Sequence, residues 1–157
     1  MKTIFALQPL EKSIFLAGPT PRNPEVPSWR PEALAILEEL GFDGTVLLPE
    51  SPDWAAHDNY NGQIEWEWQA LEMATAIVFW VPRDLARDDK GDLKMPAFTT
   101  NVEFGLYARS GKCMFGYPED AKKMTYLHAL ARKTRMPVYR DLRKTLDATV
   151  ERLRPMF

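Results

Sequence analysis

The segment from residue 76 to residue 105 decides the fold. It begins with the apolar run Ala76-Ile-Val-Phe-Trp-Val81, continues through a polar loop, and ends in Thr99-Thr-Asn-Val-Glu-Phe-Gly105. This pattern predicts a buried strand followed by a helix whose first turn carries Glu103. In a parallel α/β sheet, ligands bind beyond the carboxyl ends of the strands. The helix dipole favours an ionised carboxylate there, and such a group is suited to attack a sugar carbon.

The same alternation of strand and helix continues through the rest of the chain. Further strands are expected at residues 14–17, 45–48, 112–116 and 137–139, and helices at residues 31–40, 63–75, 100–110, 118–133 and 142–154, the last capped by Asp141. Strands that alternate with helices of this length imply a parallel sheet with right-handed crossovers. We therefore expect residues 1–157 to form one α/β domain, a flavodoxin-like doubly wound sandwich with a five-stranded parallel sheet. Residues 3–7 are a candidate edge strand, and the long connection at residues 82–98 is a candidate functional loop.

Composition limits the classes of function. The net charge is −2 and no segment is strongly basic, which argues against nucleic-acid binding. No segment is long and apolar enough to span a membrane, and the N-terminus lacks the apolar region of a signal peptide. The single cysteine, Cys113, lies in an apolar run and suits a reducing cytoplasm. We therefore expect a cytoplasmic protein that acts on small molecules.

Glu103 has two interpretations. Thr100-Asn-Val-Glu103 matches a capping box, in which the glutamate bonds back to the start of its own helix. On this local pattern alone, a structural cap is favoured. The position after a buried strand, with Gly105 leaving room beside it, favours a carboxylate that faces a ligand.

Glu67 is the second candidate carboxylate. It lies on the helix Gln63-Ile-Glu-Trp-Glu-Trp-Gln-Ala-Leu71. If this face of the helix points toward the carboxyl edge of the sheet, Glu67 joins Glu103, and two carboxylates in different surroundings can divide the roles of acid and nucleophile. The alternative is that Glu65 and Glu67 are solvent charges and that Trp66 and Trp68 are packing residues.

The loop Gly18-Pro-Thr-Pro-Arg-Asn23 follows the first strand. Its backbone, with Thr20 or Arg22, could contact a sugar hydroxyl or a phosphate, and a plain proline-stiffened loop is an equal alternative. The loop is neither a dinucleotide fingerprint nor a Walker motif.

Other chemistries have little support in the sequence. The two histidines, His57 and His128, have no metal-ligand spacing, so we expect no metal. The polar residues of the second strand–helix connection could bind sugar hydroxyls, although a hydrophilic loop is the simpler reading; these residues are Asp53, Asp58, Asn59 and Asn61.

Several blocks of this sequence resemble the nucleoside 2-deoxyribosyltransferase-like proteins. They are Ile14-Phe-Leu-Ala-Gly-Pro19, Gln63-Ile-Glu-Trp-Glu67 with Leu71, Ala76-Ile-Val-Phe-Trp-Val-Pro82, Thr99-Thr-Asn-Val-Glu-Phe-Gly105 and Gly116-Tyr-Pro118. The blocks span most of residues 13–135. The resemblance implies a flavodoxin-like fold and an N-glycosidic substrate, a nucleoside or nucleotide together with a free nucleobase.

The resemblance also assigns roles to residues. Glu103 occupies the place of the glutamate that forms a glycosyl-enzyme, and Glu67 the place of the acid that contacts the base. Asn101 and the loop with Gly18, Thr20 and Arg22 become candidate sugar binders, and Phe15 and Trp80 candidate aromatic walls. Phe15 stands where many of these transferases have a tyrosine, and Ala97 where well-studied members have an acidic residue.

Three functions follow from the resemblance. The first is base exchange on a 2′-deoxynucleoside with no metal or organic cofactor. The alternatives are hydrolysis of a nucleoside 5′-monophosphate, suggested by Thr20 and Arg22, and a non-catalytic nucleotide-binding module, suggested by the absent tyrosine. The family also assembles as dimers or larger rings, so a homo-oligomer is expected, with Trp66, Trp68, Tyr107 and Phe157 as candidate contacts.

Overall fold

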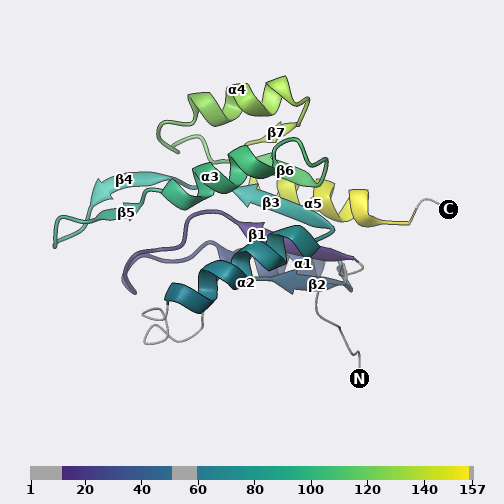
Figure 1. The fold of residues 1–157 in the computed structure, drawn as a ribbon, viewed down its shortest axis with the longest axis horizontal. Helices are drawn as coiled ribbons and strands as arrows, with labels where there is room; N and C mark the ends of the chain where they lie inside the picture. The colour runs from purple at the N-terminus through teal and green to yellow at the C-terminus, as the bar shows by residue number, and fades with distance from the viewer. Residues whose placement is uncertain (1–11, 51–59, 156–157) are drawn as a thin grey trace.

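A five-stranded parallel sheet forms the centre of the protein. The computed structural model describes residues 12–50 and 60–155 (Figure 1). The strands of the sheet are β1 (Ser13–Ala17), β2 (Thr45–Leu47), β3 (Ala76–Trp80), β6 (Cys113–Gly116) and β7 (Val138–Tyr139), in the order β2-β1-β3-β6-β7. Every neighbouring pair is parallel. This is the doubly wound, flavodoxin-like arrangement, so the predicted fold is confirmed.

Helices cover both faces of the sheet. One face packs against α1 (Arg30–Glu39) and α5 (Leu142–Leu153), and the other against α2 (Tyr60–Met73), α3 (Phe98–Tyr107) and α4 (Thr125–Lys133). Neighbouring side chains of one strand therefore enter different cores: Ile14 and Leu16 pack under α1, whereas Phe15 packs with the α2–α3 side. Strands buried on both faces need continuous apolar runs, which explains the strong sequence signal of β1 and β3.

The connection at residues 82–98 is a small antiparallel hairpin rather than a loop. It consists of β4 (Asp84–Arg87) and β5 (Leu93–Met95), which pair only with each other among the described strands. The Asp88 carboxylate accepts hydrogen bonds from the backbone N–H groups of Lys90 and Asp92 and so closes the turn. The strands are short and polar, and their sequence lacks the alternation that would have revealed them.

Helix α3 begins earlier than predicted. Its first residue is Phe98, and it follows Ala97, which has a left-handed backbone (φ 60°). Thr100 is buried inside the helix and no side chain caps its start. Glu103 therefore lies in the second turn, and the capping-box interpretation is wrong.

Of the predictions for the last two helices, the start of α4 is wrong and the cap of α5 is right. Helix α4 begins at Thr125 instead of Pro118, because contacts with Arg83 hold residues 122 and 123 outside the helix: the Arg83 carbonyl accepts from the N–H of Lys122, and Arg83 donates to the carbonyl of Lys123. The cap of α5 is confirmed, since the Asp141 carboxylate accepts a 2.9 Å hydrogen bond from the N–H of Lys144.

Two expectations about the chain as a whole remain. The candidate edge strand at residues 3–7 lies outside the described residues. Within the described part of the chain, no helix has the length and apolar character needed to cross a bilayer.

Candidate functional site

The ends of β1 and β3 approach each other closely at the carboxyl edge of the sheet. The chain leaves β1 toward β2 on one side and leaves β3 toward β6 on the other, so the switch point of the fold lies between these two strands. Gly18 follows β1 with φ 149°, and a Cβ atom there would lie 2.1 Å from the Trp80 carbonyl oxygen. Only glycine fits this approach, which explains why Gly18 stands here.

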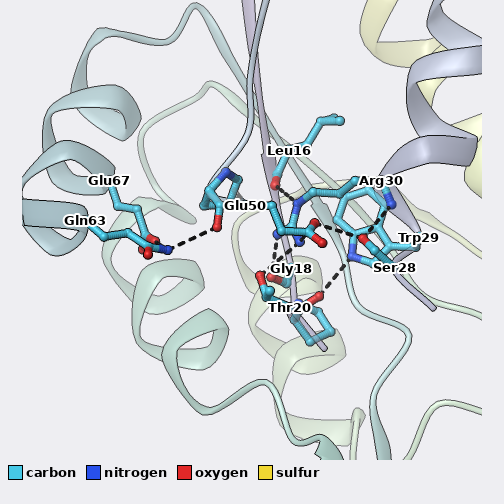
Figure 2. Close-up of polar contacts among 11 residues, drawn as sticks. Leu16, Gly18, Thr20, Ser28, Trp29, Arg30, Glu50, Gln63 and Glu67 are labelled. Atoms are coloured by element: carbon cyan, nitrogen blue, oxygen red, sulfur yellow. Dashed lines mark hydrogen bonds and ion pairs between the residues drawn. The ribbon is translucent and has the colours of Figure 1, made fainter. Parts of the chain in front are cut away.

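A buried arginine organises this edge (Figure 2). Arg30, the first residue of α1, is 1% exposed. Its Nε donates to the Leu16 carbonyl (3.1 Å) and its Nη2 to the Gly18 carbonyl (2.9 Å). Its Nη1 donates to Thr20 Oγ1 (3.0 Å) and to a carboxylate oxygen of Glu50 (2.8 Å). The guanidinium thus joins the start of α1 to the ends of β1 and β2.

Glu50 is the direct partner of this charge. It follows β2, and its Oε2 also accepts a 2.8 Å hydrogen bond from the hydroxyl of Ser28. Burial lowers the pKa of Arg30, and the neighbouring Glu50 carboxylate opposes that effect. A buried charge with a bonded counter-ion is the arrangement that limits the cost of desolvation.

Glu67 lies on α2 beside this cluster, partly buried (Figure 2). The side chain of Gln63, one turn earlier, donates to Glu67 Oε1 at 2.9 Å and to the Pro49 carbonyl at 3.2 Å. Burial raises the pKa of Glu67, while the Gln63 hydrogen bond and the Arg30 charge act to lower it.

Glu103 shares the electrostatic environment of Glu67 and Arg30. Burial, together with the negative charge of Glu67, raises the pKa of Glu103 to about 7, and the positive charge of Arg30 acts to lower it. The expectation that a helix start keeps this carboxylate ionised is therefore wrong, because Glu103 lies in the second turn and loses solvent. The charge of Glu67 acts on Glu103, so the two predicted carboxyl groups lie close enough to interact electrostatically.

The two predicted aromatic walls do not form one wall. Phe15 and Trp80 are both buried, in the cores on opposite faces of the sheet. The ring of Phe15 lies beneath Trp66 of α2, with 6.3 Å between ring centroids, and Trp66 remains 41% exposed. Trp66 is therefore better placed than Phe15 to contact a ligand, and Phe15 supports it from below.

The predicted sugar binders are held by two different arginines. The Thr20 hydroxyl accepts from Arg30. Asn101 Oδ1 accepts from Arg83, a buried residue of the β3–β4 connection that also donates to the Lys123 carbonyl. Both polar side chains are thus fixed in orientation.

The comparison with protein families agrees with this arrangement. The family model described as nucleoside 2-deoxyribosyltransferase like matches residues 11–121, more than two thirds of the chain. The chain belongs to this family. The match includes the ends of β1, β2 and β3 and both carboxylate-bearing helices. A comparison with curated proteins gives no match.

Arg22 lies apart from Thr20 in this nucleoside 2-deoxyribosyltransferase-like protein. It is exposed and lines an open hollow of about 500 Å³ between the loop after β1, the β4–β5 hairpin and the start of α3. Arg87 and Lys90 of the hairpin add two further cations, and Asp88 and Asp92 add two carboxylates. The hollow can accept a group that carries both negative charge and hydrogen-bonding oxygens.

The remaining polar candidates are those of the second strand–helix connection and the two histidines. Asp53, Asp58, Asn59 and His57 lie outside the described residues, as does the side chain of Asn61. His128 is bonded through Nδ1 to the hydroxyl of Tyr117 at 2.7 Å. Among the described residues, no group of three or more histidines, cysteines or carboxylates is placed to hold a metal ion.

Sequence reasoning missed Arg30 and Glu50. Their signal is weak, because arginine before a helix proline and glutamate after a strand proline both suggest solvent-exposed residues. The acceptors of Arg30 come from positions 16, 18, 20 and 50, which only the tertiary fold brings together.

Proposed function

We propose that the protein is a nucleoside 2-deoxyribosyltransferase that exchanges the base of a 2′-deoxynucleoside through a covalent glycosyl-enzyme on Glu103. One observation carries the proposal: the carboxyl groups of Glu103 and Glu67 interact electrostatically with the buried guanidinium of Arg30, which is hydrogen-bonded to the end of β1 at the switch point of the sheet. Glu67 is assigned as the acid that contacts the base. Trp66, a partly exposed aromatic ring above Phe15, is assigned to stack on the substrate.

The reaction requires one proton to be shared by the two carboxyl groups. An ionised Glu103 oxygen attacks the anomeric carbon, and the N-glycosidic bond breaks. The electron pair of that bond goes to the nitrogen of the leaving base. The base then takes a proton from Glu67 or from water. The acceptor base then attacks the same carbon, releases Glu103 and returns a proton to Glu67. Two displacements give net retention at the sugar.

Repulsion between the carboxyl groups favours states in which one of the two holds a proton. The negative charge of Glu67 raises the pKa of Glu103. When Glu67 holds the proton, that charge is gone and Glu103 ionises more readily. The acid and the nucleophile are then in their working forms at the same pH.

A base-exchange assay tests the proposal. Incubation of the protein with a deoxynucleoside and a different free base is expected to give the exchanged nucleoside. Glu103→Ala and Glu67→Gln are expected to reduce the exchange rate by at least about 100-fold, as loss of a nucleophile or general acid does. Glu65→Gln is the matched control, because Glu65 is an exposed carboxylate on the same helix as Glu67. Undiminished exchange by folded Glu103→Ala would remove Glu103 from the mechanism.

The second candidate function is hydrolysis of a nucleoside 5′-monophosphate. The hollow lined by Arg22, Arg87 and Lys90 favours it, because three cationic side chains suit a phosphate. Arg22→Ala is expected to lower kcat/KM for the phosphorylated substrate by roughly tenfold and to leave the unphosphorylated one unchanged. Arg109→Ala, an exposed arginine beyond the end of α3, serves as control. An equal loss with both substrates would contradict phosphate recognition.

A non-catalytic nucleotide-binding module is the remaining alternative. It predicts saturable binding of deoxynucleosides or nucleotides, measured by calorimetry, with no product after prolonged incubation with or without an acceptor base. Turnover in either assay excludes it.

Homo-oligomer formation is part of the proposal. Helix α3 carries Phe98, Val102 and Leu106 at intervals of four residues, and each side chain is more than half exposed. Such an apolar stripe on one helix face is typical of a protein–protein contact. Trp68 of α2 is exposed in the same way, whereas Tyr107 donates to Glu72 and Phe157 lies outside the described residues. Light scattering is expected to give a dimer or larger species, and Leu106→Lys a smaller one.

A further inference from the structure

Arg30 carries a charge in a place where a charge is costly. Its side chain is fully enclosed, and the guanidinium lies 4.8 Å from the ring centroid of Trp29. Removing an arginine from water costs several kcal/mol before any partner is counted. A cross-link between strands and helix could be made by apolar packing at lower cost. The buried charge of Arg30 therefore suggests a role beyond holding the strands and the helix together.

The hydrogen bonds of Arg30 fix the backbone at the rim of the site. Four of its five N–H groups have acceptors among the described residues, and three of these acceptors belong to the segment from Leu16 to Thr20. This segment includes Gly18, which sits against the end of β3. The rigid planar fork of arginine matches this set of acceptors, and a lysine ammonium does not.

The charge of Arg30 also acts on the reacting carboxyl groups. Within the described part of the chain, Glu103 faces Arg30 of α1, Glu67 of α2, and Tyr107 on its own helix, and Arg30 faces Glu50 after β2. Arg30 is the one cation in this set. It lowers the pKa of both Glu103 and Glu67, against burial, which raises them.

We propose that Arg30 is a positioning residue for the reaction at Glu103: its fork holds the Gly18–Thr20 segment at the rim, and its charge favours the ionised nucleophile. The kinetic part of this proposal rests on the proposed function. The electrostatic part does not, because the ionisation of Glu103 can be measured without a substrate.

The first test separates the effect of the Arg30 charge on Glu103 from the structural role of the Arg30 side chain. Arg30→Met alone would leave the partly buried Glu50 without its cationic partner, so the comparison is Arg30→Met/Glu50→Gln against Glu50→Gln. Carboxyl ¹³C NMR on glutamate-labelled protein, assigned with Glu103→Gln, follows the ionisation of Glu103. We expect its half-ionisation point to rise by about 1 pH unit in the double variant. Arg30→Gln/Glu50→Gln, which retains hydrogen-bond donors, is a second neutral version should the methionine variant not fold.

The second test addresses the fork. Arg30→Lys keeps the charge, so the pH dependence of base exchange is expected to stay close to that of the wild type while KM rises roughly tenfold, because the rim segment is displaced. Arg143→Met is the matched control: Arg143 pairs with Glu39 on the exposed side of α1 and should change neither reading.

The outcomes are distinguishable. An unchanged titration of Glu103 in a folded neutral variant overturns the electrostatic role, and a wild-type KM in Arg30→Lys overturns the role of the fork. If the wild-type protein exchanges no base, the proposed function fails, and the NMR titration still decides whether Arg30 controls Glu103.

Discussion

Gln63 holds the Glu67 carboxylate from one turn earlier on α2, with 2.9 Å between Gln63 Nε2 and Glu67 Oε1. The same nitrogen donates to the Pro49 carbonyl, so Glu67 is tied to the end of β2 as well as to its own helix. The orientation of the Glu67 carboxylate is therefore fixed by a hydrogen bond to one of its two oxygens. The first prediction concerns this hydrogen bond.

Replacing Gln63 should raise the pKa of Glu67. The hydrogen bond from Gln63 favours the ionised form of Glu67 and acts against burial. In Gln63→Ala the protonated form should therefore persist to higher pH, and the alkaline limb of the base-exchange rate should move to higher pH with it. Rate profiles and a ¹³C titration of Glu67 measure both effects. Gln69→Ala, an exposed position on the same helix, should leave them unchanged.

Replacing Glu67 should lower the pKa of Glu103. Glu67→Gln removes the negative charge that opposes ionisation of Glu103. The half-ionisation point of Glu103 should therefore fall from about 7 toward the ordinary value of 4.5. Carboxyl NMR measures the change, with Glu65→Gln as the control. A half-ionisation point that stays at about 7 would show that the two groups are not coupled.

Glu103 should destabilise the folded protein above neutral pH. Its folded pKa of about 7 lies above the ordinary 4.5, so the folded state binds the proton more tightly than the unfolded state does. The stability of the wild type relative to Glu103→Gln should therefore fall between pH 4.5 and pH 7 and stay low above it. The largest difference corresponds to about 3 kcal/mol as an upper limit.

Denaturant unfolding at pH 4, 6 and 8 checks this prediction. The two proteins should be close in stability at pH 4, where both states of the wild type are protonated. Glu103→Gln should be the more stable protein at pH 8. Equal stability at both extremes would contradict the burial of an ionisable group at this position.

Gly18 should tolerate no side chain. Gly18→Ala places a Cβ atom against the Trp80 carbonyl and 2.9 Å from a ring carbon of Trp29, with a backbone angle that L-residues rarely adopt. We expect a loss of about 2–4 kcal/mol in the free energy of unfolding. Gly105→Ala is the control, because a Cβ there meets open space and the α3 helix should gain about 0.5–1 kcal/mol. Thermal and urea unfolding measure both.

The fold could be predicted because its strands are buried on both sides. Runs such as residues 76–81 have no polar interruption, and proline or glycine marks most of their ends. The β4–β5 hairpin escaped prediction because its strands are half exposed and its stability comes from side-chain contacts in the turn, such as those of Asp88. The start of α4 was misplaced because proline at residue 118 suggested a first helical position, whereas contacts with Arg83 decide the backbone there.

The candidate site could be predicted only in part. Glu67 and Glu103 were singled out from short motifs on two helices, and in the fold the charge of Glu67 acts on Glu103. Their ionisation could not be predicted, since it depends on burial and on Arg30. A local pattern also suggested that Thr100 caps α3, but the cap position is Ala97, whose left-handed backbone lies three residues earlier.

The β4–β5 hairpin lies in the connection between β3 and α3, and its strands take no place in the central sheet; its Asp88 accepts a 2.9 Å hydrogen bond from Asn23 of the loop after β1. It supplies Arg87 and Lys90 to the hollow that also contains Arg22. Its length and sequence can therefore change without disturbing the register of β3 or the position of Glu103. The hairpin can therefore vary in evolution, or be exchanged by engineering, while the central sheet and its helices stay the same.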